Sequence, residues 1–332
     1  MRLFLRLLAA ACILLAAAGG AAYWWGSIWL AAPGPLAAPK TLVIPKGSKP
    51  DTIGHQLEAE GVITNGFALA PVFWVTRLDG ELRAGEYAFP VAVTPQGVLD
   101  LLRSGKTVVH KLVVPEGLTT AEILARVAHG EALSGDVTDN PGEGQLWPAT
   151  YSYSYDDKRE ALVEDMKRRA QRNLAELWAE RDKDLPIDTP EQALVLASIV
   201  EKETAIPAER PKVAAVLYNR LRQGMKLQMD PTVAYAVTGG THPLDHPLTK
   251  AELATDSPYN TYLNTGMPPG PIANPGRAAL EAVLKPEHSD LLYFVADGTG
   301  GHAFASTLEE HNRNVAHWRQ VQADRAAAAG QK

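Results

Sequence analysis

The clearest pattern in the chain is an uncharged apolar segment near the N-terminus. Residues 7–32 contain no charged side chain, and Arg2 and Arg6 precede them. A helix rises about 1.5 Å per residue and the hydrocarbon core of a bilayer is about 30 Å thick, so the segment is long enough to span a membrane. We predict a transmembrane helix over residues 7–29, after a cytoplasmic tail of residues 1–6.

The residues flanking this segment predict its orientation. Basic residues before a span favour a cytoplasmic N-terminus, which places the rest of the chain on the periplasmic side of the plasma (inner) membrane as a single-pass protein. An aromatic cluster at the far end fits the membrane interface; it consists of Tyr23, Trp24, Trp25 and Trp29. The alternative is a signal peptide cleaved within the small residues 18–22.

Short β and helix signals follow the apolar segment. Residues 30–40 are rich in Pro and Ala and predict a semi-rigid linker. Residues 41–110 begin with an apolar strand pattern, Leu42-Val43-Ile44, and continue with amphipathic helices. One of these is expected to begin at Thr94-Pro95 and to end at Gly105. These residues therefore predict a small α+β module.

The longer remainder, residues 111–325, mixes helix and strand patterns and predicts an α/β domain. Two strands are expected at residues 291–296 and 302–305, and a capping box at Thr307 should begin the last helix. Residues 326–332 are expected to fray. The fold class is thus α+β: a transmembrane helix, a small module and a mixed α/β domain.

Composition narrows the classes of function. Hydrophobic residues make up 46% and charged residues 21%, which argues against a disordered chain or a multi-span membrane protein. The net charge of −6 and the lack of a basic cluster argue against nucleic acid as a partner. The one cysteine, Cys12, excludes an intrachain disulfide and a multi-cysteine metal site.

One helix carries the candidate chemistry. Thr189, Pro190 and Gln192 together predict a capping box with proline in the first turn. Residues 193–200 contain no charge, which indicates a helix buried nearly all round. The helix then runs directly into the polar sequence of residues 201–204, Glu-Lys-Glu-Thr.

Helical spacing separates the two glutamates of that sequence. Glu203 lies three, four and seven residues after Val200, Ile199 and Leu196, so it continues the stripe of large aliphatic side chains. Glu201 lies on a smaller, more polar face. Because burial raises the pKa of a carboxyl group, as a general acid at neutral pH requires, we predict Glu203 as the catalytic residue.

Polar side chains elsewhere could contact a substrate. Asn219, Gln228 and Asp230 follow in the next two helices and the turn between them. Tyr259 and Asn260 belong to a long Pro/Gly-rich loop, a type that is usually functional in a compact domain. These five residues are our candidate substrate contacts.

Structural interpretations of the same residues remain open. Glu203 could form a salt bridge with a nearby arginine such as Arg220, and Asp230 could simply cap a helix. His242 and His246 are four residues apart, but a proline follows each of them, so a helical metal pair is not expected.

Several segments resemble those of the endolytic murein transglycosylase family (MltG, YceG-like). They occur in order from about residue 42 to residue 320. At Ala149, directly after Pro148, the sequence departs from the family, which usually has aspartate at this position. Ala149 therefore receives no role. The matching segments are SIVEKET (198–204), VLYNRL (216–221), LQMDPT (227–232), YNTY (259–262), GMPPGPI (266–272) and YFVADG (293–298).

The resemblance implies a LysM-like module at residues 41–110 and a YceG-like catalytic domain at residues 111–325. It also implies cleavage inside peptidoglycan glycan strands, between N-acetylmuramic acid (MurNAc) and N-acetylglucosamine (GlcNAc). The products end in 1,6-anhydroMurNAc. The resemblance further implies that this cleavage terminates the elongation of nascent strands. The family's catalytic glutamate maps to Glu203, the residue that helical spacing favours.

The implied chemistry needs neither a metal nor a cofactor, and peptidoglycan synthases (penicillin-binding proteins) are the implied protein partners. Two other functions stay open. One is a non-catalytic, membrane-tethered scaffold that binds glycan for a wall synthase complex. The other is an ordinary glycoside hydrolase that pairs Glu203 with Glu201, Glu209 or Asp230.

Overall fold

The computed structural model describes residues 1–75 and 84–329, and the chain divides into two compact units. The first comprises Met1–His110 with Ser152–Asp157, and the second comprises Lys111–Tyr151 with Lys158–Lys332. Residues 76–83 of the predicted module lie outside the described residues. The LysM-like fold and the predicted domain limits stay predictions.

The first unit contains the apolar N-terminal helix and a small α+β body. Strands β1 and β2 pair antiparallel, from Lys40 opposite Phe89 to Ile44 opposite Gly85. The alternation of exposed and buried residues along β2 places one face of this pair on the core. The elements are α1 (Arg2–Ala31), β1 (Lys40–Ile44), α2 (Pro50–Ala59), α3 (Leu69–Val75), β2 (Gly85–Phe89) and α4 (Pro95–Ser104).

The helix expected after Thr94 is confirmed. The Thr94 hydroxyl accepts a hydrogen bond from the Gly97 amide, Pro95 occupies the first turn, and Gly105 ends the helix in the left-handed region with φ 62°. Glycine meets that conformation without a steric penalty, so the sequence fixes both ends of α4.

Helix α1 contains the predicted span of residues 7–29 but is longer, running from Arg2 to Ala31, and its end has a different environment. Within residues 1–75 and 84–329, it is the one helix long and apolar enough to cross a membrane. Trp29, which the sequence placed at the membrane interface, is instead buried in the core of the first unit, and its indole N–H donates to Thr64 at 3.2 Å. The end of α1 is therefore part of the folded body.

The segment predicted as a semi-rigid linker is also held against that body. The Gly34 amide donates to the Val93 carbonyl at 3.1 Å, and the Ala92 amide donates to the Leu36 carbonyl at 3.0 Å. A Pro/Ala composition indicates an extended segment but cannot show where its backbone groups find partners.

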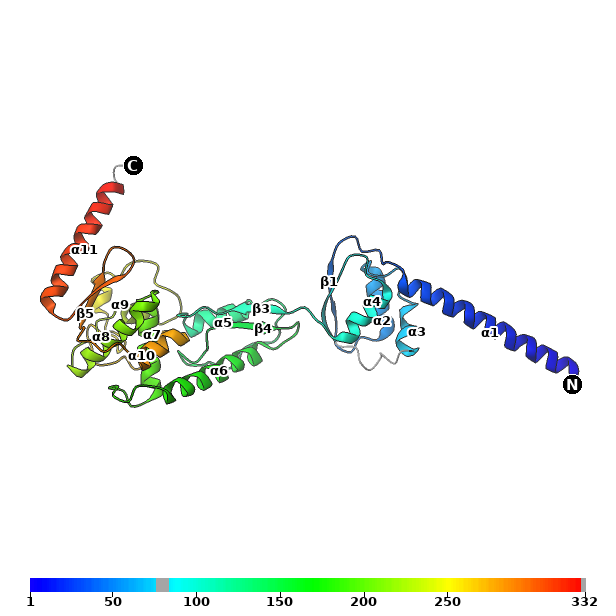
Figure 1. Cartoon of the computed structure of the whole chain (residues 1–332), viewed down its shortest axis with the longest axis horizontal. Helices are drawn as coiled ribbons and strands as arrows, with labels where there is room; N and C mark the ends of the chain where they lie inside the picture. The colour runs from blue at the N-terminus through cyan, green and yellow to red at the C-terminus, as the bar shows by residue number, and fades with distance from the viewer. Residues whose placement is uncertain (76–83, 330–332) are drawn as a thin grey trace. The chain divides into compact units, whose positions relative to one another are not determined.

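The second unit is mainly helical. Helices α7, α8 and α10 contact one another around its largest core cluster (Figure 1). The remaining elements, in chain order, are β3 (His110–Val113), α5 (Thr120–Ala128), β4 (Thr150–Tyr153), α6 (Arg159–Ala179), α7 (Pro190–Glu203), the 3-10 helix η2 (Pro207–Glu209), α8 (Arg210–Arg222), α9 (Asp230–Thr238), the 3-10 helix η3 (Glu252–Ala254), α10 (Arg277–Leu284), β5 (Tyr293–Ala296), β6 (His302–Ala305) and α11 (Leu308–Ala329).

Helix α7 forms as the sequence predicts. The Thr189 hydroxyl accepts from the Gln192 amide, and the Gln192 side chain accepts from the Thr189 amide, each at 3.3 Å. Its seven buried residues include Leu196, Ile199 and Val200, and each such aliphatic side chain stabilises the fold by about 1.5–3 kcal/mol. This packing fixes the direction in which the end of α7 points.

The final strands and helix also match the prediction. β5 and β6 pair antiparallel, with Phe294 opposite Phe304 and Ala296 opposite His302. All four residues of β5 are half-buried. The Thr307 capping box is present, but α11 runs on to Ala329, so residues 326–329, which were expected to fray, are helical. Residues 330–332 of the predicted tail lie outside the described part of the chain.

Candidate functional site

A cavity of about 310 Å³ lies at the C-terminal end of α7. It brings together three of the residues singled out in the sequence, Glu203, Gln228 and Asp230. Polar groups dominate its exposed lining, as expected of a site for a carbohydrate rather than for an apolar ligand. The lining residues are Glu203, Arg220, Gln228, Met229, Asp230, Tyr262, Phe294, Val295, Ala296 and His302.

Glu203 is the last residue of α7 and is half-buried. Burial raises the pKa of its carboxyl group, the negative charge of Asp230 raises it further, and Arg220 opposes both, giving a pKa of about 8. Its place at the C-terminal, negative end of the helix dipole acts in the same direction. Glu203 is therefore mostly protonated at neutral pH while still bordering the cavity.

Arg220 does not neutralise Glu203 as the salt-bridge interpretation requires. Its Nε donates to the Leu292 carbonyl at 2.7 Å, and one Nη donates to the carbonyls of Lys226 and Leu227 at 3.3 and 2.7 Å. The guanidinium thus holds the backbone around the cavity. Its positive charge reaches Glu203 only as a weaker influence that lowers the carboxyl pKa.

Asp230 has a role other than the predicted helix cap. It is the first residue of α9, Met229 occupies the cap position, and no side chain caps the helix. The Asp230 carboxylate instead accepts a hydrogen bond from the Tyr262 hydroxyl at 2.6 Å. The capping interpretation was wrong because the proline after Asp230 fixes where the helix begins but not where the carboxylate points.

A threonine holds the turn of Gln228 and Asp230 in place. Gln228 has φ 54°, in the left-handed region, and its amide donates to the Thr261 carbonyl at 3.2 Å. The Thr261 hydroxyl accepts from the Met229 amide at 3.0 Å and is hydrogen-bonded to Thr232 at 2.8 Å. This buried contact offsets the backbone strain at Gln228 and aligns the turn with the loop that carries Tyr262.

Glu201 lies on the other face of α7, as the spacing predicts. Its carboxylate accepts from the Gly276 amide at 2.8 Å, at the N-terminus of α10, and pairs with Arg210 at 3.5 Å. A carboxylate at a helix N-terminus is favourably placed relative to the helix dipole. Glu201 therefore connects α7 to α10 and does not line the cavity.

Three predicted contacts lie outside this cavity. The Asn219 amide donates to the carbonyls of Ser289 and Leu291 at 2.7 and 2.9 Å. Asn260 is fully buried and bonds the backbone of its own loop. Tyr259 packs against Tyr235 with the two rings tilted by 48° and 4.8 Å between ring centroids. The structure gives these side chains roles in holding loops, and Asn260 in particular fixes the loop before Tyr262.

Sequence reasoning missed two polar residues of the cavity as site residues, Tyr262 and His302. Tyr262 lay within a quoted motif, YNTY, beside the two residues that were chosen. His302 lay in an expected strand, and only its pairing with Ala296 of β5 brings it to the cavity. Long-range contacts of this kind leave no periodic signal in the sequence.

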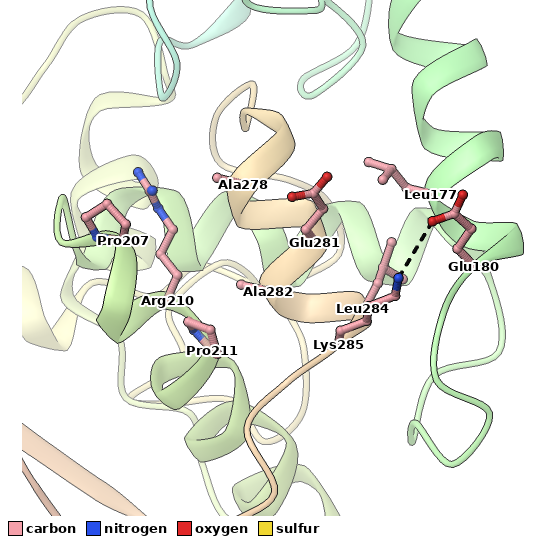
Figure 2. Close-up of a pocket in the computed structure, with 10 residues that line it drawn as sticks. All are labelled: Leu177, Glu180, Pro207, Arg210, Pro211, Ala278, Glu281, Ala282, Leu284 and Lys285. Atoms are coloured by element: carbon pink, nitrogen blue, oxygen red, sulfur yellow. Dashed lines mark ion pairs between the residues drawn. The ribbon is translucent and has the colours of Figure 1, made fainter.

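Another cavity, of about 420 Å³, lies between α6, α8 and α10. Figure 2 shows the ion pair of Lys285 with Glu180 on one side of α10 and Arg210 on the other side, with Glu281 between them. Its charged residues already have partners, since Arg210 pairs with Glu201 and Glu281 with Arg277. The chemistry therefore points to the Glu203 cavity.

Within residues 1–75 and 84–329, no cluster of three His, Cys, Asp or Glu side chains could hold a metal ion. The Glu203 cavity offers one protonated carboxyl group, one carboxylate that is hydrogen-bonded to a tyrosine, an arginine and a histidine. Such a set can donate a proton to a leaving oxygen and stabilise charge beside it.

Comparison with known proteins matches almost the whole chain. The model of the YceG-like family covers residues 42–317. A protein of Bacillus subtilis (strain 168) named endolytic murein transglycosylase is 33% identical over an alignment of 302 residues, and the match covers 81% of this chain and 82% of the relative. A protein of the same name from Streptococcus pneumoniae (strain D39) is 31% identical, and the match covers 83% of this chain but 58% of that longer relative.

A solved structure is also similar. The crystal structure of a YceG-like protein from Listeria monocytogenes has a TM-score of 0.53 and 34% sequence identity, and the match covers 83% of this chain and 98% of that one. The sequence and structure comparisons therefore agree in matching this chain to YceG-like proteins.

Proposed function

This chain belongs to the YceG-like family, and we propose that it is a membrane-anchored lytic transglycosylase that cleaves peptidoglycan glycan strands internally. The bond cut is the one between MurNAc and GlcNAc, and the new end is 1,6-anhydroMurNAc. The names of its relatives support the class of reaction. The residues of the Glu203 cavity support the mechanism.

In this mechanism the protonated Glu203 donates its proton to the glycosidic oxygen as the bond from that oxygen to the anomeric carbon of MurNAc breaks. The C6 hydroxyl oxygen of the same MurNAc attacks the anomeric carbon, and the Glu203 carboxylate accepts the hydroxyl proton. The carboxyl group is thereby restored, and no water is consumed. One carboxyl group thus performs both steps, contributing typically about 10²–10⁴-fold to the rate.

One observation carries the proposal. Glu203 borders a polar cavity and has a pKa of about 8, so it is protonated at neutral pH without being shut away from a substrate. A residue that served only as buried structure would not need an open cavity. A general acid needs both the proton and the access.

The anchor and the partner belong to the same proposal. Helix α1 would cross the inner membrane with the N-terminus in the cytoplasm, because Arg2 and Arg6 precede the uncharged run. The catalytic unit would then act on strands emerging from peptidoglycan synthases and terminate their elongation. A chain tethered at the membrane meets nascent glycan before mature wall.

Mass analysis of digested glycan strands tests the reaction class. The purified full-length protein in detergent is incubated with uncrosslinked glycan strands, and the ends of the products are identified. The proposal expects internal cuts and 1,6-anhydroMurNAc ends. Intact strands would contradict the proposal and favour the scaffold, in which glycan is bound but not cut.

A hydrolase is the second candidate, and Asp230 is the observation that favours it. Asp230 is a second carboxyl group lining the cavity with Glu203, and ordinary glycosidases use two such groups. Its hydrogen bond to Tyr262 satisfies one oxygen and makes it a weaker choice for activating water. Reducing MurNAc ends, rather than anhydro ends, in the same mass analysis would establish hydrolysis.

A further inference from the structure

We propose that His302 binds the glycan in the Glu203 cavity and that Glu209 positions it for this purpose. The inference rests on the proposed function, because it assigns a further residue to the same reaction. It adds a binding residue on β6, far from α7 in sequence, and a positioning residue in η2, the next element after α7.

His302 is the first residue of β6 and lines the same cavity as Glu203. It lies opposite Ala296 of β5, which also lines the cavity. The Phe294 ring packs edge-on against the imidazole, with 5.3 Å between the ring centroids. The side chain is 19% exposed, so it is held firmly while part of it still reaches solvent. The strand pair thus presents an imidazole to the space where the substrate would lie.

Glu209 binds His302 through both carboxylate oxygens. Oε2 accepts from the imidazole Nδ1 at 2.7 Å, and Oε1 accepts from the His302 backbone amide at 2.8 Å. Burial alone would raise the pKa of Glu209, but the hydrogen bonds from His302 and Thr204 outweigh burial and lower it. Because an ionised carboxylate only accepts hydrogen bonds, Nδ1 carries the hydrogen.

With the hydrogen on Nδ1, the neutral form of the ring has Nε2 as an acceptor, and Nε2 lies on the side of the imidazole away from the bond to Glu209. Each sugar of a glycan strand offers hydroxyl and acetamido N–H donors to such an acceptor. In its neutral form, His302 can therefore accept a hydrogen bond from a sugar of the glycosidic bond whose oxygen Glu203 protonates. The carboxylate behind the imidazole strengthens the acceptor and fixes the orientation of the ring.

The same carboxylate is tied to the end of the catalytic helix. The hydroxyl of Thr204, the residue directly after Glu203, donates to Glu209 Oε2 at 2.8 Å. Glu209 thus connects the end of α7 to the first residue of β6, which is 93 positions away from it in the chain. A displacement of β6 relative to Glu203 would break this connection, so the geometry between the acid and the imidazole is defined.

A purely structural link between α7 and β6 is the competing explanation. Three variants in the full-length protein separate the two: His302→Ala, His302→Gly and Glu209→Gln. Initial rates of anhydro-end formation are measured over a range of glycan concentrations, with the melting temperature of each variant. His317→Ala, which alters an exposed histidine of α11, is the matched control.

The proposal expects His302→Ala to lower kcat/KM about 10-fold or more, since a substrate hydrogen bond is lost. Added imidazole should restore part of the rate of His302→Gly, and Glu209→Gln should show a smaller loss. His317→Ala should behave like the unchanged protein. Imidazole rescue is a readout that a structural link would not produce.

Full activity in His302→Ala would overturn the proposal, as would a loss that imidazole cannot rescue and that follows the melting temperature. If His302→Ala does not fold, His302→Gln decides: a slower rate at unchanged melting temperature supports the proposal, and an unchanged rate rejects it. Failure of the proposed function gives a different result. The unchanged protein would then make no anhydro ends at all.

Discussion

At the scale of the residue, the surroundings of two glutamates on one helix decide what each can do. Glu203 borders a polar cavity and holds its proton, whereas Glu201 is ionically paired and caps the start of α10. The two are only two positions apart, so a helix directs them to different faces. Spacing along the helix was sufficient to predict the two directions, but not the burial of Glu201, whose side chain is only 6% exposed where it meets Gly276 and Arg210.

The first prediction concerns pH. Only the protonated Glu203 can act as the acid, so kcat/KM should fall with rising pH above about 8, approaching tenfold per pH unit. The pH dependence of the initial rate of anhydro-end formation measures this. A rate that falls instead between pH values of about 4 and 5 would indicate an ordinary carboxyl group.

The raised pKa of the Glu203 carboxyl group should also make the free energy of unfolding depend on pH. The folded pKa of about 8 lies above that of the unfolded chain, so the folded state binds more protons between the two values. Stability should therefore fall as pH rises from about 4.5 to about 8 and not change further through this group. Glu203→Gln should remove that component, which urea unfolding at several pH values can measure.

The second prediction concerns Glu201. Glu201→Gln should lower the free energy of unfolding by about 1–3 kcal/mol, because the charge-assisted bond to Gly276 and the pairing with Arg210 are weakened. Glycan cleavage at a temperature where the variant stays folded should remain near normal. Urea unfolding and a cleavage assay on the same sample measure both. Unchanged stability with lost activity would contradict the assignment.

The sequence did not predict that Tyr262 and His302 would line the cavity. Tyr262 meets Asp230 across 32 positions, and His302 meets Glu209 across 93. Periodicity reports the direction of a side chain only within one element. Pairing between distant loops depends on how the elements pack, which a single sequence does not contain.

At the scale of the element, helix ends were the most predictable feature. Thr94, Thr189 and Thr307 each form the expected cap, because these caps need only residues within one turn. Asp230 shows the limit of the same reasoning, since a distant tyrosine hydroxyl binds its side chain. A local rule fails where a long-range partner offers a stronger hydrogen bond.

The third prediction tests the element that carries Asp230. Asp230→Asn removes a negative charge that raises the pKa of Glu203, so the fall in activity at high pH should move to lower pH. Tyr262→Phe is the matched control, because it removes the hydrogen bond but keeps the Asp230 charge. A pH–rate profile of both variants measures the shift. Equal shifts in the two variants would mean that the Asp230 charge is not the cause.

At the scale of the whole molecule, the sequence predicted an apolar helix, a small α+β module and a mixed α/β domain, and the structure has an N-terminal apolar helix and a mixture of helices and two-stranded sheets. It did not predict that Trp29 enters the core of the first unit. A tryptophan at the end of an apolar run suits a membrane interface and a protein core equally well. Only the position of Thr64 and the neighbouring core residues distinguishes the two environments.

The fourth prediction follows from that burial. Trp29→Ala should destabilise the first unit by about 3–5 kcal/mol, because a large buried side chain is lost. Trp24→Ala, at a residue that is 68% exposed, is the control and should change stability little. Hydrogen exchange of the first unit in detergent micelles measures both. Similar effects of the two substitutions would show that Trp29 is not part of that core.

The most direct test of the account compares Glu203→Gln with Glu201→Gln in the mass analysis of glycan ends. Glutamine keeps the size of the side chain but removes the exchangeable carboxyl proton. The account predicts that Glu203→Gln lowers formation of 1,6-anhydroMurNAc ends by at least about 10² while the protein stays folded, and that Glu201→Gln largely retains it. Undiminished anhydro ends from folded Glu203→Gln would contradict the account.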